Sequence, residues 1–168
     1  MSAGARDTGR FSQRTHERAR LLIERIHASG RTAMVQPYQQ AVDVHGETAI
    51  VCLDGETSHA LRKGPVLRPD EVAPVRDDGV GAAEVMYDPT LVVAGVATGP
   101  ELALARQTLA YVAERFGEVP LYGRIDLVAD SDGEPILMEL ELIEPNLFLH
   151  LHPDSLPRVV RAVLAAAG

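Results

Sequence analysis

The sequence predicts an α+β fold in which a mainly antiparallel sheet packs against helices. Two Asp-Gly pairs, Asp54-Gly55 and Asp132-Gly133, each separate two runs with strand character, which is a typical hairpin signal. Helical patterns stand before, between and after the hairpins, so hairpins rather than crossover units form the centre of the fold. A chain of 168 residues has room for one hydrophobic core.

Composition and charge exclude several classes of function. Hydrophobic residues make up 46% of the chain and charged residues 24%, which is typical of a folded soluble protein. The formal net charge of −8 opposes the phosphate contacts that dominate nucleic-acid binding. Cys52 is the single cysteine, so the chain has no intramolecular disulfide and no thiolate zinc cage. No segment approaches the roughly 20 apolar residues of a membrane span, and we expect a cytoplasmic protein.

The first half of the chain is predicted to contain one helix and four strands. Residues 1–10 lack periodicity and are expected to form a loop, whereas residues 12–29 carry an amphipathic helical pattern that Gly30 ends. Strands are expected at residues 32–38, 47–53, 56–62 and 83–87, with an irregular loop at residues 64–80.

The second half is predicted to contain two helices around a second hairpin. Pro100 fits the first turn of a helix that runs to residue 116, and Gly117 stops this helix. Two strands follow at residues 121–129 and 134–143, and a last helix covers residues 155–167.

The second hairpin separates charged from apolar side chains. If Asp132-Gly133 forms a two-residue turn, Asp126 lies opposite Glu139 and Arg124 lies opposite Glu141, all on one face. The other face then pairs Ile125, Leu127 and Ala129 with Leu140, Met138 and Ile136. We expect that apolar face to pack on a helix.

The charged face predicts a cation site. Like charges directly opposite each other destabilise a sheet, so Asp126 and Glu139 need a counterion or solvent. Carboxylate oxygens suit a hard cation, and Mg²⁺ commonly takes one or two carboxylates together with substrate phosphates. Glu144 and Asn146 extend this polar run. The alternative is that the acids simply line the solvated face of an antiparallel sheet.

The first hairpin places an acid beside a base. With Asp54-Gly55 as a two-residue turn, Glu47 lies opposite Arg62. A structural cross-strand ion pair worth a few tenths of a kcal/mol is the simpler explanation of this pairing.

Four stretches together resemble the later part of ATP-grasp ligases: VQPYQQAVDVHGETAIVCLDG, HALRKG, YGRIDLV and ILMELELIEPN. The resemblance covers nearly the whole chain and is to the glutathione-synthetase-like and D-alanine-D-alanine-ligase-like groups. SAGARDTGR and GETAIVCLDGETSHALRKGPV are similar to the subgroup that contains the cyclising ligase of cycloserine biosynthesis. The implied fold is the ATP-grasp C-terminal subdomain.

The resemblance implies a nucleotide site on the first half of the chain. The backbone of Gln36, Pro37 and Tyr38 would contact adenine, and Glu47 would accept hydrogen bonds from the ribose hydroxyls, with Asp43 as the second choice. Arg62 would reach the phosphates, with Lys63 as its neighbour and substitute.

The resemblance also implies the residues that carry the chemistry. Asp126, Glu139 and Glu141 match the Mg²⁺ ligands, although many relatives have asparagine where this chain has Glu141. Arg124 resembles the arginine that stabilises the acyl-phosphate and the developing oxyanion. In this family ATP, with Mg²⁺ or Mn²⁺, converts a carboxylate into an acyl-phosphate, which an amine or another nucleophile then attacks.

Residues 1–168 are expected to form only part of an ATP-grasp domain. Relatives carry a Rossmann-like N-terminal domain and a subdomain with two phosphate-binding lysines, and residues 2–10 resemble the loop that follows the second lysine. Three hypotheses follow: a truncated ligase gene, one half of a split enzyme, or a remnant. We expect the isolated chain to be inactive, and either a complementing N-terminal half or self-association would cover its exposed edges and apolar surface.

Two functions of other classes compete with this hypothesis. One is a partner-binding module that binds no nucleotide. The other is a metal-binding protein that uses the acids with His150 and His152, although ordinary packing explains both histidines more simply. Cys52 is expected to be a small buried residue rather than a reactive thiol.

Overall fold

The computed structural model describes residues 7–67, 70 and 90–168 of the chain. The chain divides into two compact units. The first unit comprises Met1–Tyr38 and Pro65–Leu91, and the second comprises Gln39–Gly64 and Val92–Gly168.

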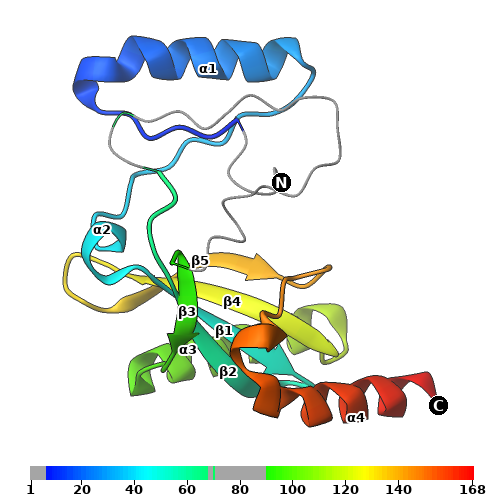
Figure 1. Ribbon diagram of the computed structural model, residues 1–168. Coiled ribbons are helices and arrows are strands. Elements are labelled where there is room, and N and C mark those ends of the chain that lie inside the picture. The colour runs from blue at the N-terminus through cyan, green and yellow to red at the C-terminus, as the bar shows by residue number, and fades with distance from the viewer. Residues whose placement is uncertain (1–6, 68–69, 71–89) are drawn as a thin grey trace. The chain divides into compact units, whose positions relative to one another are not determined.

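The second unit is built on a five-stranded antiparallel sheet (Figure 1). Its strands are β1 (Glu47–Leu53), β2 (Glu56–Lys63), β3 (Val92–Gly95), β4 (Tyr122–Ala129) and β5 (Pro135–Glu141). Their spatial order is β3-β2-β1-β4-β5, which places β1 at the centre, between its hairpin partner β2 and strand β4 of the second hairpin. The predicted α+β class and the antiparallel sheet are therefore confirmed.

One face of the sheet packs on α3 (Gly99–Phe116) and forms the core. Its buried members are Ile50, Cys52, Ala60, Ala105, Leu109, Ile125 and Leu127. Sequence signals fix both ends of α3. Thr98 and Glu101 form a reciprocal capping box at its start, and Gly117 adopts a left-handed φ of +81° at its end.

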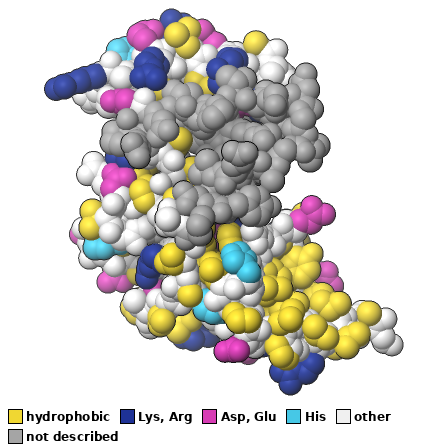
Figure 2. Space-filling model, in the orientation of Figure 1, with side chains coloured by type: hydrophobic (Ala, Val, Ile, Leu, Met, Phe, Trp, Pro, Cys, Tyr) yellow, Lys and Arg dark blue, Asp and Glu magenta, His cyan; other side chains and the backbone are white. Residues whose placement is uncertain are grey.

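The end of the chain forms a helix that is not covered on one side. Two 3₁₀ turns, η4 (Leu149–Leu151) and η5 (Pro153–Ser155), lead into α4 (Leu156–Ala167). Figure 2 shows hydrophobic side chains gathered over α4. The large exposed ones are Leu156, Val160, Val163 and Leu164, which are between 47% and 66% exposed. Their spacing gives α4 an apolar stripe along one side.

The first unit contains α1 (His16–Ala28), which follows a 3₁₀ turn, η2 (Gln13–Thr15). Leu22 is its buried residue. Asp7 is also buried, and its carboxylate accepts hydrogen bonds from Arg31 at 2.7 Å and from Arg25 at 3.4 Å. The predicted helix at residues 12–29 is confirmed, since η2 and α1 together cover residues 13–28.

The secondary structure differs from the sequence prediction in two respects. The strand expected at residues 32–38 was wrong, since Met34 and Val35 are 84% and 77% exposed and the segment joins no sheet among the described residues. Strand propensity without a neighbouring strand does not produce a ladder. The strand at residues 83–87 lies outside the described residues. The short elements β3 and α2 (Val42–His45) were not predicted.

The first hairpin turns at Asp54-Gly55 as predicted, but a bulge changes its register. Cys52 pairs with Thr57, whereas Val51 pairs with His59, so Ser58 is an extra residue on β2. Beyond the bulge Glu47 pairs with Lys63, and the predicted pairing of Glu47 with Arg62 was wrong.

The second hairpin differs from the predicted register in its turn and at a later register shift. The two differences cancel at the charged positions. Its turn is longer than the predicted two residues, because Asp130 Oδ1 accepts hydrogen bonds from the backbone N–H groups of Asp132 and Glu134. Leu127 consequently pairs with Leu137, and Ala129 pairs with Pro135. The predicted pairings of Leu127 with Met138 and of Ala129 with Ile136 were wrong. A register shift between Asp126 and Leu127 then restores the predicted pairs Asp126 with Glu139 and Arg124 with Glu141.

No helix in the described part of the chain is long and apolar enough to cross a membrane.

Candidate functional site

The candidate site lies on the face of the sheet opposite α3, which we call the site face. Residues paired directly across strands share a face, so Asp126 shares the site face with Ala49, and Arg124 shares it with Val51. On β5 the paired residues are Glu139 and Glu141. Ile125 and Leu127, which alternate with these charged residues, point into the α3 core.

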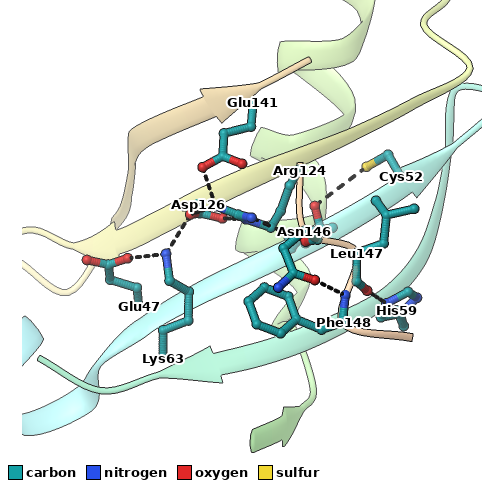
Figure 3. A network of polar contacts seen from close by, with 11 residues as sticks. Glu47, Cys52, His59, Lys63, Arg124, Asp126, Glu141, Asn146, Leu147 and Phe148 are labelled. Atoms are coloured by element: carbon teal, nitrogen blue, oxygen red, sulfur yellow. Dashed lines mark hydrogen bonds and ion pairs between the residues drawn. The ribbon is translucent and has the colours of Figure 1, made fainter. Parts of the chain in front are cut away.

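Asp126 is the centre of this charged group. It is 1% exposed and accepts hydrogen bonds from Arg124 Nε at 2.8 Å, from Arg124 Nη2 at 3.0 Å and from Lys63 Nζ at 2.7 Å. Figure 3 shows these residues converging from β4 and β2. Burial alone would raise the pKa of Asp126, but the hydrogen bonds and charges of Arg124 and Lys63 outweigh burial and lower the pKa. Asp126 is therefore ionised at neutral pH.

Lys63 links Asp126 to a second acid. Its Nζ lies 3.1 Å from Glu47 Oε2, in addition to its bond to Asp126 (Figure 3). Burial acts to lower the pKa of Lys63, whereas the charges of Asp126 and Glu47 raise it and prevail. The ammonium therefore keeps its charge although its side chain is only 18% exposed.

Arg124 is held in one orientation. Besides Asp126, it donates to Glu141 Oε1 at 2.5 Å and to the Asn146 carbonyl at 3.2 Å. These contacts use four of the five N–H donors of the guanidinium and leave one on Nη1. The site face thus presents a fixed positive group beside the acids.

Glu139 lacks such a partner. Among the described residues no hydrogen bond or ion pair reaches its side chain, and one oxygen from each of Asp126, Glu139 and Glu141 lies within 4.8 Å of the others. Burial raises the pKa of Glu139, and the neighbouring charges of Glu141 and Asp126 raise it further. A cation between the three carboxylates would remove this repulsion.

The charge balance and the donor set fit one divalent cation. Four carboxylates, of Glu47, Asp126, Glu139 and Glu141, face the two bases Lys63 and Arg124, which leaves two negative charges. Oxygen ligands of this kind suit Mg²⁺ or Mn²⁺. Since Asp126 already accepts three hydrogen bonds, Glu139 and Glu141 offer the freer oxygens.

Arg62 lies on the other face of the sheet. It pairs with Thr48 in the ladder, and its Nη1 donates a short hydrogen bond to Thr48 Oγ1, which in turn donates one to Glu101. Burial would raise the pKa of Glu101, but hydrogen bonds from Thr48 and Thr98 lower it. The bulge at Ser58 produces this arrangement, because it gives the site-face position to Lys63.

The polar segment after β5 forms hydrogen bonds with residues of the sheet. Arg124 binds the Asn146 carbonyl, and His59 Nε2 lies 2.8 Å from the Leu147 carbonyl (Figure 3). Asn146 Oδ1 accepts a hydrogen bond from the backbone N–H of Phe148, which has a left-handed φ of +49°. Sequence reasoning noticed Asn146 but missed His59. It also missed Glu101, which the Thr98-x-x-Glu101 capping-box spacing could have identified.

Gln36, Pro37 and Tyr38 belong to the first unit, whereas the site face belongs to the second. All three are exposed, and the guanidinium of Arg10 stacks over the Tyr38 ring at 3.6 Å from its centroid. Their predicted contact with adenine remains a prediction.

His152 and Cys52 have contacts that are typical of structural residues. His152 Nε2 lies 2.9 Å from the Ala60 carbonyl, and no His-containing metal group was found among the described residues. Cys52 is 1% exposed, and burial raises the pKa of its thiol to about 11. The expectation of a small buried residue at Cys52 is confirmed.

Comparisons with known proteins find a relative that matches nearly the whole chain. The cycloserine biosynthesis protein DcsG of Streptomyces lavendulae is 36% identical over 163 residues, which are 95% of this chain and 50% of that protein. A crystal structure of D-cycloserine synthetase DcsG superposes with a TM-score of 0.84 at 30% identity, over 99% of this chain and 53% of that one. No family model matches the sequence.

A D-alanine–D-alanine ligase from Bacillus anthracis, solved with ATP, is 9% identical with a TM-score of 0.48, over 89% of this chain and 47% of that one. The similarity to DcsG confirms the resemblance that the motifs indicated. The chain spans about half the length of the relatives that it matches.

Proposed function

We propose that this chain, a member of the ATP-grasp superfamily, supplies the cation- and phosphate-binding part of an ATP-dependent carboxylate–amine ligase that acts through an acyl-phosphate. The observation that carries the proposal is the charged group on the site face. Its two uncompensated negative charges lie beside a fixed lysine and a fixed arginine, as a metal–nucleotide complex requires.

Asp126, Glu139 and Glu141 are the residues that would hold Mg²⁺, with Mn²⁺ as a substitute. When bound, the cation would neutralise the negative charge of the phosphates during phosphoryl transfer. Glu139 is the most informative of the three ligands, because its carboxylate has no other described partner to satisfy.

Lys63 takes the phosphate role that the resemblance gives to Arg62 or its neighbour. Its ammonium lies on the site face against Asp126, whereas Arg62 is bound to Thr48 on the α3 face. An ammonium held between two carboxylates stays charged and can attract a phosphate oxygen.

Arg124 is the candidate for stabilising the acyl-phosphate. Asp126, Glu141 and the Asn146 carbonyl hold its guanidinium in place, so it needs no reorganisation when charge develops. Its remaining Nη1 donor is the group that would reach an oxyanion.

The nucleoside contacts follow from the resemblance. Glu47 bonds Lys63 through Oε2, which leaves Oε1 to accept a ribose hydroxyl. The backbone of Gln36, Pro37 and Tyr38 would contact the adenine edge.

Turnover would need more of the ligase than the matched half. We propose that the remaining part acts together with this chain, whether it lies in the same polypeptide or in another. The apolar stripe of α4 favours a second candidate function, a partner-binding or self-associating module without nucleotide binding.

Calorimetric titration with Mg²⁺ and a non-hydrolysable ATP analogue separates these two functions. The proposal expects saturable binding that Glu139→Gln weakens by at least about tenfold, since a charged ligand is lost. Asp132→Asn, an exposed acid in the hairpin turn, is the matched control and should bind as the unmodified chain does. Absence of binding by the folded chain, or equal binding by Glu139→Gln, would refute the proposal.

A further inference from the structure

A cavity of about 410 Å³ lies in the second unit and contains none of the charged residues of the candidate site. Its wall includes Ser58 and His59 of β2, His152 between the two 3₁₀ turns, Ser155 of η5, and Arg158 and Arg161 of α4. This volume is within the range of about 300–1,000 Å³ that small-molecule sites occupy.

Arg158 is built into the cavity wall. Its Nη1 donates to the Thr57 carbonyl at 2.8 Å, and its Nη2 donates to the Leu53 carbonyl at 3.4 Å. Three of its five N–H donors remain. A guanidinium anchored in this way needs little ordering when it binds a ligand.

The two arginines of the wall have no acidic partner in the part of the chain that the structure describes. Neither Arg158 nor Arg161 forms an ion pair with any described residue, although the chain as a whole carries a net charge of −8. Asp154 also lines the cavity and is exposed, but it pairs with neither arginine. The lining therefore carries an excess positive charge.

The histidines form a rigid part of the wall. His59 and His152 stack with ring centroids 4.7 Å apart, and each bonds a backbone carbonyl through Nε2. Burial, together with the charge of His152, lowers the pKa of His59 although the Leu147 carbonyl opposes this effect. The arginines keep their positive charge at any physiological pH, so the cavity carries two permanent cationic groups.

We propose that this cavity binds a small organic oxyanion, a carboxylate or a phosphate monoester, through Arg158 and Arg161. The planar fork of arginine donors matches both kinds of oxyanion. Leu151 and Pro153 give the cavity an apolar wall that would contact the carbon skeleton of the ligand. The site is separate from the cation group and does not depend on nucleotide binding.

The test is an NMR titration of the ¹⁵N-labelled chain with succinate and, separately, with glycerol phosphate, at constant ionic strength set by chloride. The proposal expects saturable shifts at Ser58, His59 and Arg161 with at least one of the two ligands. The ligand that binds more tightly identifies the kind of oxyanion.

Charge variants make the test specific. Arg161→Gln should weaken binding about tenfold, because one charge-assisted contact is lost, and Asp154→Asn should tighten it. Arg106→Gln removes an exposed arginine from α3 and should change nothing. Glu139→Gln should also leave this binding intact. A failure of the nucleotide proposal can therefore be distinguished from a failure of the oxyanion proposal. Absence of saturable shifts with both ligands, or equal effects of Arg161→Gln and Arg106→Gln, would overturn the proposal.

Discussion

Lys63 Nζ lies 2.7 Å from Asp126 Oδ2, although their strands β2 and β4 are separated by β1. Ala49 of β1 lies between them, paired with Leu61 on one side and with Asp126 on the other. Its small side chain lets the lysine cross the central strand. One ammonium therefore connects three strands on the site face, since it also contacts Glu47 of β1.

The buried pair of Asp126 and Arg124 should be costly to break from either side. Asp126→Asn leaves Arg124 and Lys63 without their shared acceptor, and we expect a loss of about 3 kcal/mol in the free energy of unfolding. Urea denaturation measures this loss. The double variant Asp126→Asn with Arg124→Met should cost less than the two single variants added together. Additive costs would contradict a coupled pair.

Removal of the Glu139 charge should have the opposite effect on stability. Glu139→Gln relieves the repulsion from Asp126 and Glu141, and we expect the free energy of unfolding to rise by about 0.5 kcal/mol in the absence of divalent cations. Mg²⁺ with the ATP analogue should then stabilise the unmodified chain but not the variant. Thermal unfolding with and without ligand measures both effects, and a destabilised variant would show that Glu139 has an unrecognised partner.

Lys63 and Arg62 should be separable by substitution. Lys63→Met should abolish binding of the Mg²⁺–nucleotide analogue, because the ammonium on the site face is lost. Arg62→Met should cost about 1 kcal/mol of stability through Thr48 and Glu101, yet leave nucleotide binding within about twofold. Calorimetry on both variants decides between them. Loss of binding in Arg62→Met but not in Lys63→Met would show that Arg62, and not Lys63, contacts the phosphates.

Stability should fall on the acid side because of His59. Its pKa in the folded chain is below the ordinary value of 6.5, so the folded state binds fewer protons than the unfolded state does. The stability that His59 contributes is present above pH 6.5 and is lost as pH falls toward its folded pKa. His59→Gln keeps a donor for the Leu147 carbonyl and should flatten this part of the pH profile. An unchanged slope in urea denaturation between pH 7 and pH 5 would count against the assignment.

Much of the fold could be predicted because the decisive signals are local. Asp54-Gly55, Pro100 and Gly117 mark a turn and two helix ends whose chemistry depends on neighbouring residues. The strand expected at residues 32–38 failed because a strand also needs a partner, which the pattern of one segment does not reveal.

The candidate site shows the same limit at the level of single residues. The face shared by Asp126, Glu139 and Glu141 could be predicted, since alternation along a hairpin fixes it. The resemblance named Lys63 as a substitute for Arg62, but the hairpin pattern could not place Lys63 on the site face, because the bulge at Ser58 depends on how two strands pair. Contacts between residues far apart in the sequence, such as the one between His59 and Leu147, could not be predicted either.

The central claim is that the acids of the site face hold a divalent cation on a nucleotide. Electron paramagnetic resonance with Mn²⁺ and the non-hydrolysable ATP analogue tests it most directly. We expect bound Mn²⁺ to saturate at one ion per chain, and the folded double variant Glu139→Gln with Glu141→Gln to bind none. Stoichiometric Mn²⁺ binding by that double variant, or no binding by the unmodified chain, would contradict the claim.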